Sequence, residues 1–116
     1  MVRVTAANVH VLKGPMAAWR EDVEEGWPLW ARLEDGAAVA VCCSVRRSEH
    51  AHEAGVETRP DRRGLGYGSA VTAAWIRGMQ ALRVLPIYST SWENEASRGV
   101  ARRLALVPFG TDYHLT

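Results

Sequence analysis

Changes in the spacing of apolar residues predict a mixed order of strands and helices in the first part of the chain. Residues 2–13 are rich in valine and indicate an extended start, either continuous or broken at residues 6–8. Residues 16–25 repeat apolar side chains at helical spacing with charged side chains between them, which predicts an amphipathic helix. Residues 27–34 and 37–46 predict two strands joined by an Asp-Gly hairpin turn, and the second is almost continuously apolar, as expected when both faces are covered.

The middle of the chain predicts a strand, a helix and another strand. After a polar connection at 47–53, residues 54–58 predict a third strand, antiparallel to 37–46. The next helix ends before Pro86, and residues 86–90 predict a short strand. Because two strands joined by a helix make a right-handed crossover, we expect 54–58 and 86–90 to lie parallel and adjacent. The apolar stripe of the helix consists of Val71, Ala74, Trp75, Gly78 and Leu82.

The chain ends in a second predicted helix, opened by residues 91–94 with Ser91 or Asn94 as candidate N-cap and continuing to 104, and in a strand or hairpin over 106–115. With 116 residues and 47% hydrophobic residues, we expect a single domain over 1–116 with one core. The net charge of +1 gives no general basicity for nucleic acid. We see no apolar stretch that could span a membrane and no signal-peptide pattern at the start, so a cytoplasmic location is expected.

A basic, glycine-rich turn over 62–68 joins strand 54–58 to the helix after it. Backbone N–H groups at a helix start lack intrahelical partners and lie at the positive end of the helix dipole. The glycines allow close approach of a ligand, and the arginines add charge, which favours a phosphate or pyrophosphate site. A dinucleotide fingerprint is not met, a Walker A loop is excluded, and a tight connection that binds nothing is the alternative. The glycines are Gly64, Gly66 and Gly68, and the arginines are Arg59, Arg62 and Arg63.

The only cysteines, Cys42 and Cys43, are adjacent in a predicted strand. Neighbouring strand residues point to opposite faces, so a disulfide between them is not expected, and we interpret both as small core residues. The four histidines show no metal-ligand spacing with them, so no metal site is expected.

The hexapeptide over 63–68, Arg-Gly-Leu-Gly-Tyr-Gly, resembles the R/Q-x-x-G-x-G/A signature of the GNAT acyltransferases, the acetyl-coenzyme A-dependent N-acetyltransferase superfamily. A second block over 94–106 resembles that family's Asn-x-Ala-Ser helix start and the helix after it. The resemblance covers roughly residues 37–115. It implies a mixed, mostly antiparallel sheet with a splayed parallel strand pair and flanking helices, and it implies acetyl-coenzyme A as cofactor.

The resemblance also implies a cofactor site. The open edge of the splayed strand, Val56, Glu57 and Thr58, would pair with the pantetheine amides, as an added β-strand would. Asn94 and Ser97 would reach the pantetheine arm or the sulfur, with helix capping as the alternative role of Asn94. The pyrophosphate would be received by Arg63, Gly64, Leu65, Gly66, Tyr67, Gly68 and Ser69.

Catalysis would need a general base near the acceptor nitrogen and an acid for the departing thiolate. Glu57 is the first candidate base, and a cross-strand ion pair with Arg46 or Arg47 is its alternative role. His52, expected in an exposed loop, is the second candidate. Many family members carry a tyrosine acid where this chain has Ala101, so Ser97, Tyr113, Tyr88 or a water would have to serve. We expect the acceptor to be a small-molecule or peptide amine.

The part before Ala37 is shorter than in complete family members, which leaves the acceptor site open. The chain is therefore expected to be an N-acetyltransferase with an abbreviated N-terminal part. A non-catalytic acyl-coenzyme A-binding or regulatory module is the alternative, and a plain interaction domain is the third reading. Trp19, Trp27 and Trp30 lie in or near this short part, and burying them is a reason to expect a homodimer.

Overall fold

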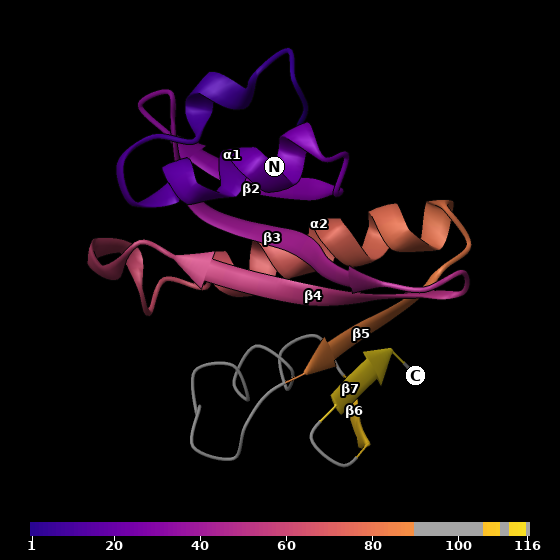
Figure 1. The fold of residues 1–116 in the computed structure, drawn as a ribbon. Helices are drawn as coiled ribbons and strands as arrows, with labels where there is room; N and C mark the ends of the chain where they lie inside the picture. The colour runs from indigo at the N-terminus through magenta and orange to yellow at the C-terminus, as the bar shows by residue number, and fades with distance from the viewer. Residues whose placement is uncertain (90–105, 110–111, 116) are drawn as a thin grey trace.

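The computed structural model describes residues 1–89, 106–109 and 112–115, and it forms one seven-stranded sheet in the order β1-β2-β3-β4-β5-β7-β6 (Figure 1). All strand pairs are antiparallel except β4 and β5, which are parallel. This confirms the expected mixed, mostly antiparallel sheet. The strands are β1 (Val2–Val4), β2 (Leu29–Glu34), β3 (Ala37–Arg47), β4 (Ala51–Thr58), β5 (Leu85–Ser89), β6 (Leu106–Phe109) and β7 (Asp112–Leu115).

Helices cover both faces of the central strands. The helix α2 (Tyr67–Ala81) packs on one face, and three short elements pack on the other (Figure 1). Figure 1 shows the N-terminal elements and α2 on opposite sides of β3. The short elements are the 3-10 helices η1 (Val9–Val11) and η2 (Gly14–Trp19) and the helix α1 (Arg20–Glu24), and a third 3-10 helix, η3 (Pro60–Arg62), follows β4.

Strand β3 supplies side chains to both layers of the core, as its continuous apolar sequence predicted. Val41 and Cys43 belong to the cluster under the N-terminal helices, whereas Cys42 packs with Trp75 and Met79 of α2. Both thiols are free and buried, and burial raises the pKa of Cys43 to about 12. The two cysteines are therefore core residues on opposite faces, as expected.

The N-terminal segment is interrupted around residues 6–8, the alternative that its sequence allowed, and residues 9–11 after the break are helical instead of extended. Strand β1 ends at Val4, and Asn8 then closes a turn in which its Oδ1 accepts a hydrogen bond from the Thr5 backbone N–H at 2.7 Å. The side chain of Asn8 competes with strand pairing at this point, and the valines at 9 and 11 lie in a 3-10 helix. The predicted helix over 16–25 is divided into η2 and α1.

The turn between β3 and β4 is shorter than the predicted polar connection over 47–53. Strand β4 already begins at Ala51, and the Ser48 backbone N–H donates to the Ala51 carbonyl at 2.8 Å. The parallel contact with β5 is confined to the start of β4, with His52 opposite Pro86. The expected parallel pair is therefore confirmed, but its predicted register was wrong, because β5 meets β4 earlier in that strand and its described pairing ends at Glu53.

Helix α2 ends at Ala81, one residue before the end of its predicted apolar stripe. Leu82 is consequently exposed, while Met79 is buried. Arg83 adopts a positive φ of 59°, which turns the chain towards β5. The predicted final hairpin is confirmed as β6 and β7, with β7 pairing to β5. The second predicted helix, opened by residues 91–94 and continuing to 104, lies outside the described residues.

In the part of the chain that the structure describes, no helix has the length and apolar character needed to cross a membrane.

Candidate functional site

The expected open strand edge is present along the second half of β4. On one side β4 pairs with β3 as far as Thr58, which lies opposite Ala40. On the other side its described pairing with β5 ends at Glu53. Figure 1 shows β5 diverging from β4 beyond that point. Residues 54–58, which include the predicted pantetheine contacts, therefore present backbone groups at a splayed edge among the described strands.

The glycine turn has a backbone that residues with side chains rarely adopt. Gly64 and Gly66 have φ values of 80° and 81°, a left-handed region that favours glycine. Gly66 is the residue before α2, and its carbonyl accepts the first helical hydrogen bond, from the Ala70 N–H at 3.1 Å. The N–H groups of residues 67–69 precede that bond and have no acceptor within the helix. The backbone N–H groups of residues 67–69 are therefore available to a ligand at the start of α2.

Ser69 adds a further donor at the same place. Its Oγ is buried and has no hydrogen-bond partner in the described structure, which is unusual for a buried polar atom. Nearby, Thr72 Oγ1 donates to the Gly68 carbonyl at 2.7 Å, so the helix satisfies that hydroxyl itself. A cluster of N–H groups and a hydroxyl that lacks a partner fits an anionic group such as a pyrophosphate.

Two of the three arginines beside the turn are engaged in ion pairs. Arg59 donates to both oxygens of Asp61, at 2.6 and 2.9 Å, and Arg62 donates to Glu34 at 2.8 Å and to Asp61 at 2.9 Å. The hydrogen bond from Arg59 lowers the pKa of Asp61, and the one from Arg62 lowers the pKa of Glu34. Among the described residues, Arg63 alone of the three has no carboxylate within ion-pair distance, and its Nε donates to the Thr58 carbonyl at 3.3 Å.

Glu34 is a residue that the sequence did not indicate. It lies at the end of β2, and its carboxylate accepts hydrogen bonds from Arg62 on one flank of the turn and from the Tyr67 hydroxyl, at 3.2 Å, on the other. The guanidinium of Arg32 lies 4.7 Å from the centre of the Tyr67 ring. The partners are 28 and 33 residues from Glu34 along the chain, so no local pattern could have linked them. The β2 end thus holds both flanks of the glycine turn.

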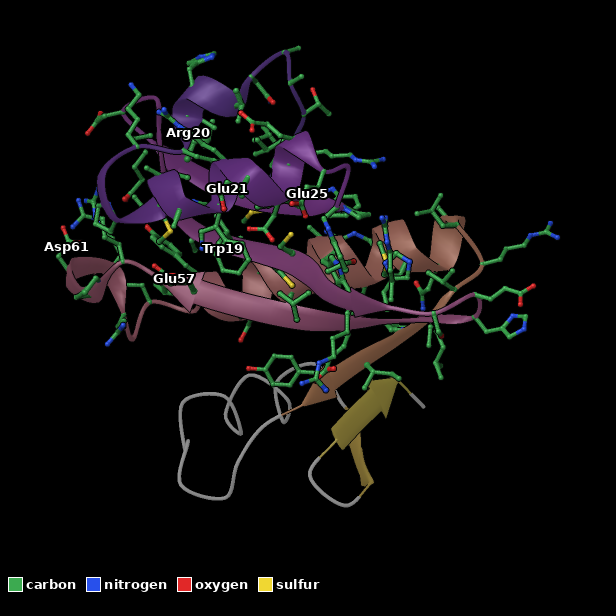
Figure 2. The ribbon with its side chains drawn as sticks, in the orientation of Figure 1. Trp19, Arg20, Glu21, Glu25, Glu57 and Asp61 are labelled. Atoms are coloured by element: carbon green, nitrogen blue, oxygen red, sulfur yellow. The ribbon has the colours of Figure 1, made fainter. Side chains whose placement is uncertain are left out.

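Glu57 lies on the face of β4 that is covered by the N-terminal helices. It is opposite Val41, which belongs to the core on that face. Its Oε1 accepts a hydrogen bond from Trp19 Nε1 at 3.2 Å, and Figure 2 shows the two side chains side by side. The arginines considered as ion-pair partners lie elsewhere: Arg46 is 3.6 Å from Glu53, and Arg47 stacks 4.5 Å from the centre of the Trp27 ring.

His52 is not the exposed loop histidine that was expected. Because β4 begins at Ala51, His52 lies within the strand and is buried, and its Nδ1 is 2.8 Å from Ser44 Oγ. Ser44 also accepts a hydrogen bond from Trp75 Nε1 at 2.9 Å. Desolvation lowers the pKa of His52, with a smaller effect from the charge of Arg47. His52 thus belongs to a buried polar network on the α2 side of the sheet, opposite to the face of Glu57.

The remaining predicted site residues lie in the last part of the chain. Asn94 and Ser97 are outside the described residues. The backbone of Tyr113 is part of β7, where it lies opposite Tyr88 of β5. Within the described residues, no three His, Cys, Asp or Glu side chains gather into a group that could hold a metal ion.

The chain resembles known proteins in sequence pattern and in fold. The family model described as GNAT acetyltransferase matches residues 30–113. An N-acetyltransferase from Staphylococcus aureus Mu50 superposes with a TM-score of 0.73 at 18% identity, covering 86% of this chain and 74% of that chain. A ribosomal-protein-alanine N-acetyltransferase from Brucella melitensis gives a TM-score of 0.67 at 21% identity, covering 84% and 72%.

A third solved structure, yncA from Salmonella typhimurium with its cofactor acetyl-CoA, gives a TM-score of 0.69 at 18% identity and covers 87% of this chain and 70% of that chain. At these identities the likeness concerns the fold. The comparison with curated proteins found no match.

Proposed function

Because this chain belongs to the GNAT acetyltransferase family, we propose that it transfers an acetyl group from acetyl-coenzyme A to an amine acceptor. The observation that carries the proposal is the start of α2. There, two left-handed glycines, unpaired N–H groups and the buried Ser69 hydroxyl lie beside an open edge of β4. A structure of the same fold, yncA, was solved with acetyl-CoA, which supports this choice of cofactor.

The cofactor would bind along two connected surfaces. The N–H groups of Tyr67, Gly68 and Ser69 and the Ser69 hydroxyl would hold the pyrophosphate, with Arg63 as the charged contact that no carboxylate neutralises among the described residues. The backbone edge of Val56, Glu57 and Thr58 would pair with the pantetheine amides. Gly64, Leu65 and Gly66 shape the turn between these surfaces. In the C-terminal part of the chain, Asn94 and Ser97 would contact the pantetheine arm or the sulfur.

The thioester of the bound cofactor supplies the acetyl group, and the chain's own residues move the protons. An ammonium acceptor must lose a proton before it can attack, and Glu57 is the proposed base. Trp19 contacts its Oε1, which leaves Oε2 to take that proton. We propose Ser97 or Tyr113 as the donor to the departing sulfur.

The experiment that tests the cofactor site compares two glycine variants by calorimetry with coenzyme A. Gly66→Val should remove measurable binding, because its side chain blocks the turn and strains its backbone. Gly26→Val is the matched control, since Gly26 has a similar φ of 87° and lies at the end of α1, away from the turn. Circular dichroism must show that both variants fold. Wild-type affinity in a folded Gly66→Val variant would exclude the phosphate-binding role of the turn.

A panel of small-molecule and peptide amines, assayed for thiol release, tests the transfer reaction itself. Acetylation of any amine, lost in Glu57→Gln with coenzyme A affinity retained, would support the proposal. Coenzyme A binding without turnover on any amine would instead favour the non-catalytic acyl-coenzyme A-binding module. If the protein neither binds coenzyme A nor acetylates any amine, the plain interaction domain remains.

A further inference from the structure

The contact between Trp19 and Glu57 joins two parts of the molecule that are distant in sequence. Trp19 is the last residue of η2, and it is 38 residues from Glu57. Its segment is held firmly, because Met16 of the same 3-10 helix is fully buried and Arg20 Nε donates to the Leu12 carbonyl at 2.7 Å. The backbone that carries the indole is therefore held in place by buried and hydrogen-bonded neighbours.

Gly55 allows the indole to lie directly on β4. A Cβ atom added there would be 3.3 Å from Trp19 Cη2 and 2.6 Å from Cγ1 of Val45. Gly55 and Glu57 are two residues apart, so they share one face of the strand. The six-membered ring of Trp19 thus lies over Gly55, while its N–H reaches the carboxylate of Glu57.

From this geometry we propose that Trp19 is a positioning residue for acetyl transfer. Its indole N–H holds one oxygen of the Glu57 carboxylate and leaves the other oriented towards the acceptor amine. This inference rests on the proposed function, in which Glu57 is the base. A glutamate side chain loses considerable rotamer freedom when it is held in one orientation, and a carboxylate that is already oriented reaches the proton without that cost at each turnover.

The test is a double-mutant cycle on turnover with the best amine of the panel. Trp19→Phe keeps an aromatic side chain at position 19 and removes the N–H donor. We expect it to lower kcat about tenfold, a part of the roughly hundredfold or greater loss expected when the base itself is removed. In the Glu57→Gln background the same change should cause almost no further loss, because Trp19 acts through Glu57. Coenzyme A affinity should stay at the wild-type value in all three variants.

Trp27→Phe is the matched control. Trp27 also belongs to the N-terminal part, and its Nε1 also donates to a glutamate at 3.2 Å, in this case the exposed Glu25. Removing that donor should leave kcat unchanged. Gly55→Ala perturbs the same contact without altering Trp19 itself, because the added methyl group would crowd the indole at 3.3 Å as well as Val45 Cγ1 at 2.6 Å. It should also lower kcat at unchanged coenzyme A affinity, and it serves if Trp19→Phe does not fold.

A measurement that needs no turnover follows the contact directly. In a ¹⁵N–¹H spectrum the indole signal that is absent from Trp19→Phe identifies Trp19, and it should shift in Glu57→Gln while the Trp27 signal does not. Equal losses of kcat for Trp19→Phe with and without Glu57, or an unshifted indole signal, would overturn the positioning role. A large loss of kcat in Glu57→Gln together with wild-type kcat in Trp19→Phe would overturn the positioning role of Trp19 and leave Glu57 as the base. Wild-type kcat in Glu57→Gln would instead overturn the base assignment and the positioning role that rests on it.

Discussion

Gly78 lies in the middle of α2, and replacing it with alanine tests how that helix packs on the sheet. In an isolated helix the change should be favourable, since glycine costs roughly 0.5–1 kcal/mol relative to alanine. In this structure, however, a Cβ atom at position 78 would overlap the indole ring of Trp30 on β2. Local propensity and tertiary packing therefore predict opposite signs for the same substitution.

The magnitude follows from how easily Trp30 can yield. The overlap involves three atoms of a rigid ring rather than the end of a flexible side chain, and the ring also carries the Arg3 guanidinium 5.2 Å from its centre. Forcing extra volume into such a contact costs about 1–3 kcal/mol. Subtracting the gain in helix propensity leaves a loss of up to about 2.5 kcal/mol in the free energy of unfolding for Gly78→Ala, with about 1 kcal/mol as the central value. In a domain of this size that central value corresponds to a fall in Tm of roughly 3–6 °C.

Thermal and urea unfolding, followed by circular dichroism, would measure this effect. Gln80→Ala is the control, because Gln80 is exposed on the same helix and its replacement should leave Tm nearly unchanged or slightly higher. In a Trp30→Leu background, where the ring is gone, Gly78→Ala should become neutral or stabilising. A higher Tm for Gly78→Ala in the wild-type background would refute the packing argument.

Two further predictions concern charge. Arg63→Ala should lower coenzyme A affinity about tenfold or more by calorimetry, the loss expected for a charged hydrogen bond. Arg59→Ala should lower coenzyme A affinity less, because the Arg59 side chain is already paired with Asp61. Equal losses of affinity in the two variants would contradict the assignment of Arg63 as the charged contact to the pyrophosphate. Because burial lowers the pKa of His52, the unfolded chain binds its proton more readily. Keeping His52 neutral in the folded protein therefore contributes to the free energy of unfolding only at high pH. The contribution is complete above the pKa of His52 in the unfolded chain, about 6.5, and falls as the pH decreases towards the lower pKa of His52 in the folded protein. Urea unfolding should show a loss between pH 7.5 and 5 that shrinks in His52→Gln and persists in His50→Gln.

The tryptophans illustrate how the tertiary structure changes an expectation from sequence. Their number in the N-terminal part suggested a homodimer that would bury them. Within the single chain, Trp19 contacts Glu57, Trp27 stacks with Arg47, and Trp30 packs against α2 at Gly78. Homodimerisation stays a prediction, and light scattering at micromolar concentration would test it.

Local sequence was sufficient wherever neighbouring residues determine the structure. The Asp-Gly turn between β2 and β3, with φ values of 51° and 76°, follows from residues that tolerate a left-handed backbone. The same holds for the glycine turn before α2, whose unpaired donors are a property of any helix start. The order of elements from β2 to β5 and the glycine turn before α2 could therefore be predicted from the chain alone.

Tertiary structure alone decided which side chains meet across the sheet. Glu34 holds Arg62 across 28 residues, and Trp19 holds Glu57 across 38. Such contacts depend on strand register, and a shift of one residue would move every side chain of a strand to the opposite face. The early start of β4 at Ala51 placed His52 in the core, and the register of β4 with β3 placed Glu57 beneath Trp19. Residue types and spacing do not specify that register, because it results from the packing of both layers at once.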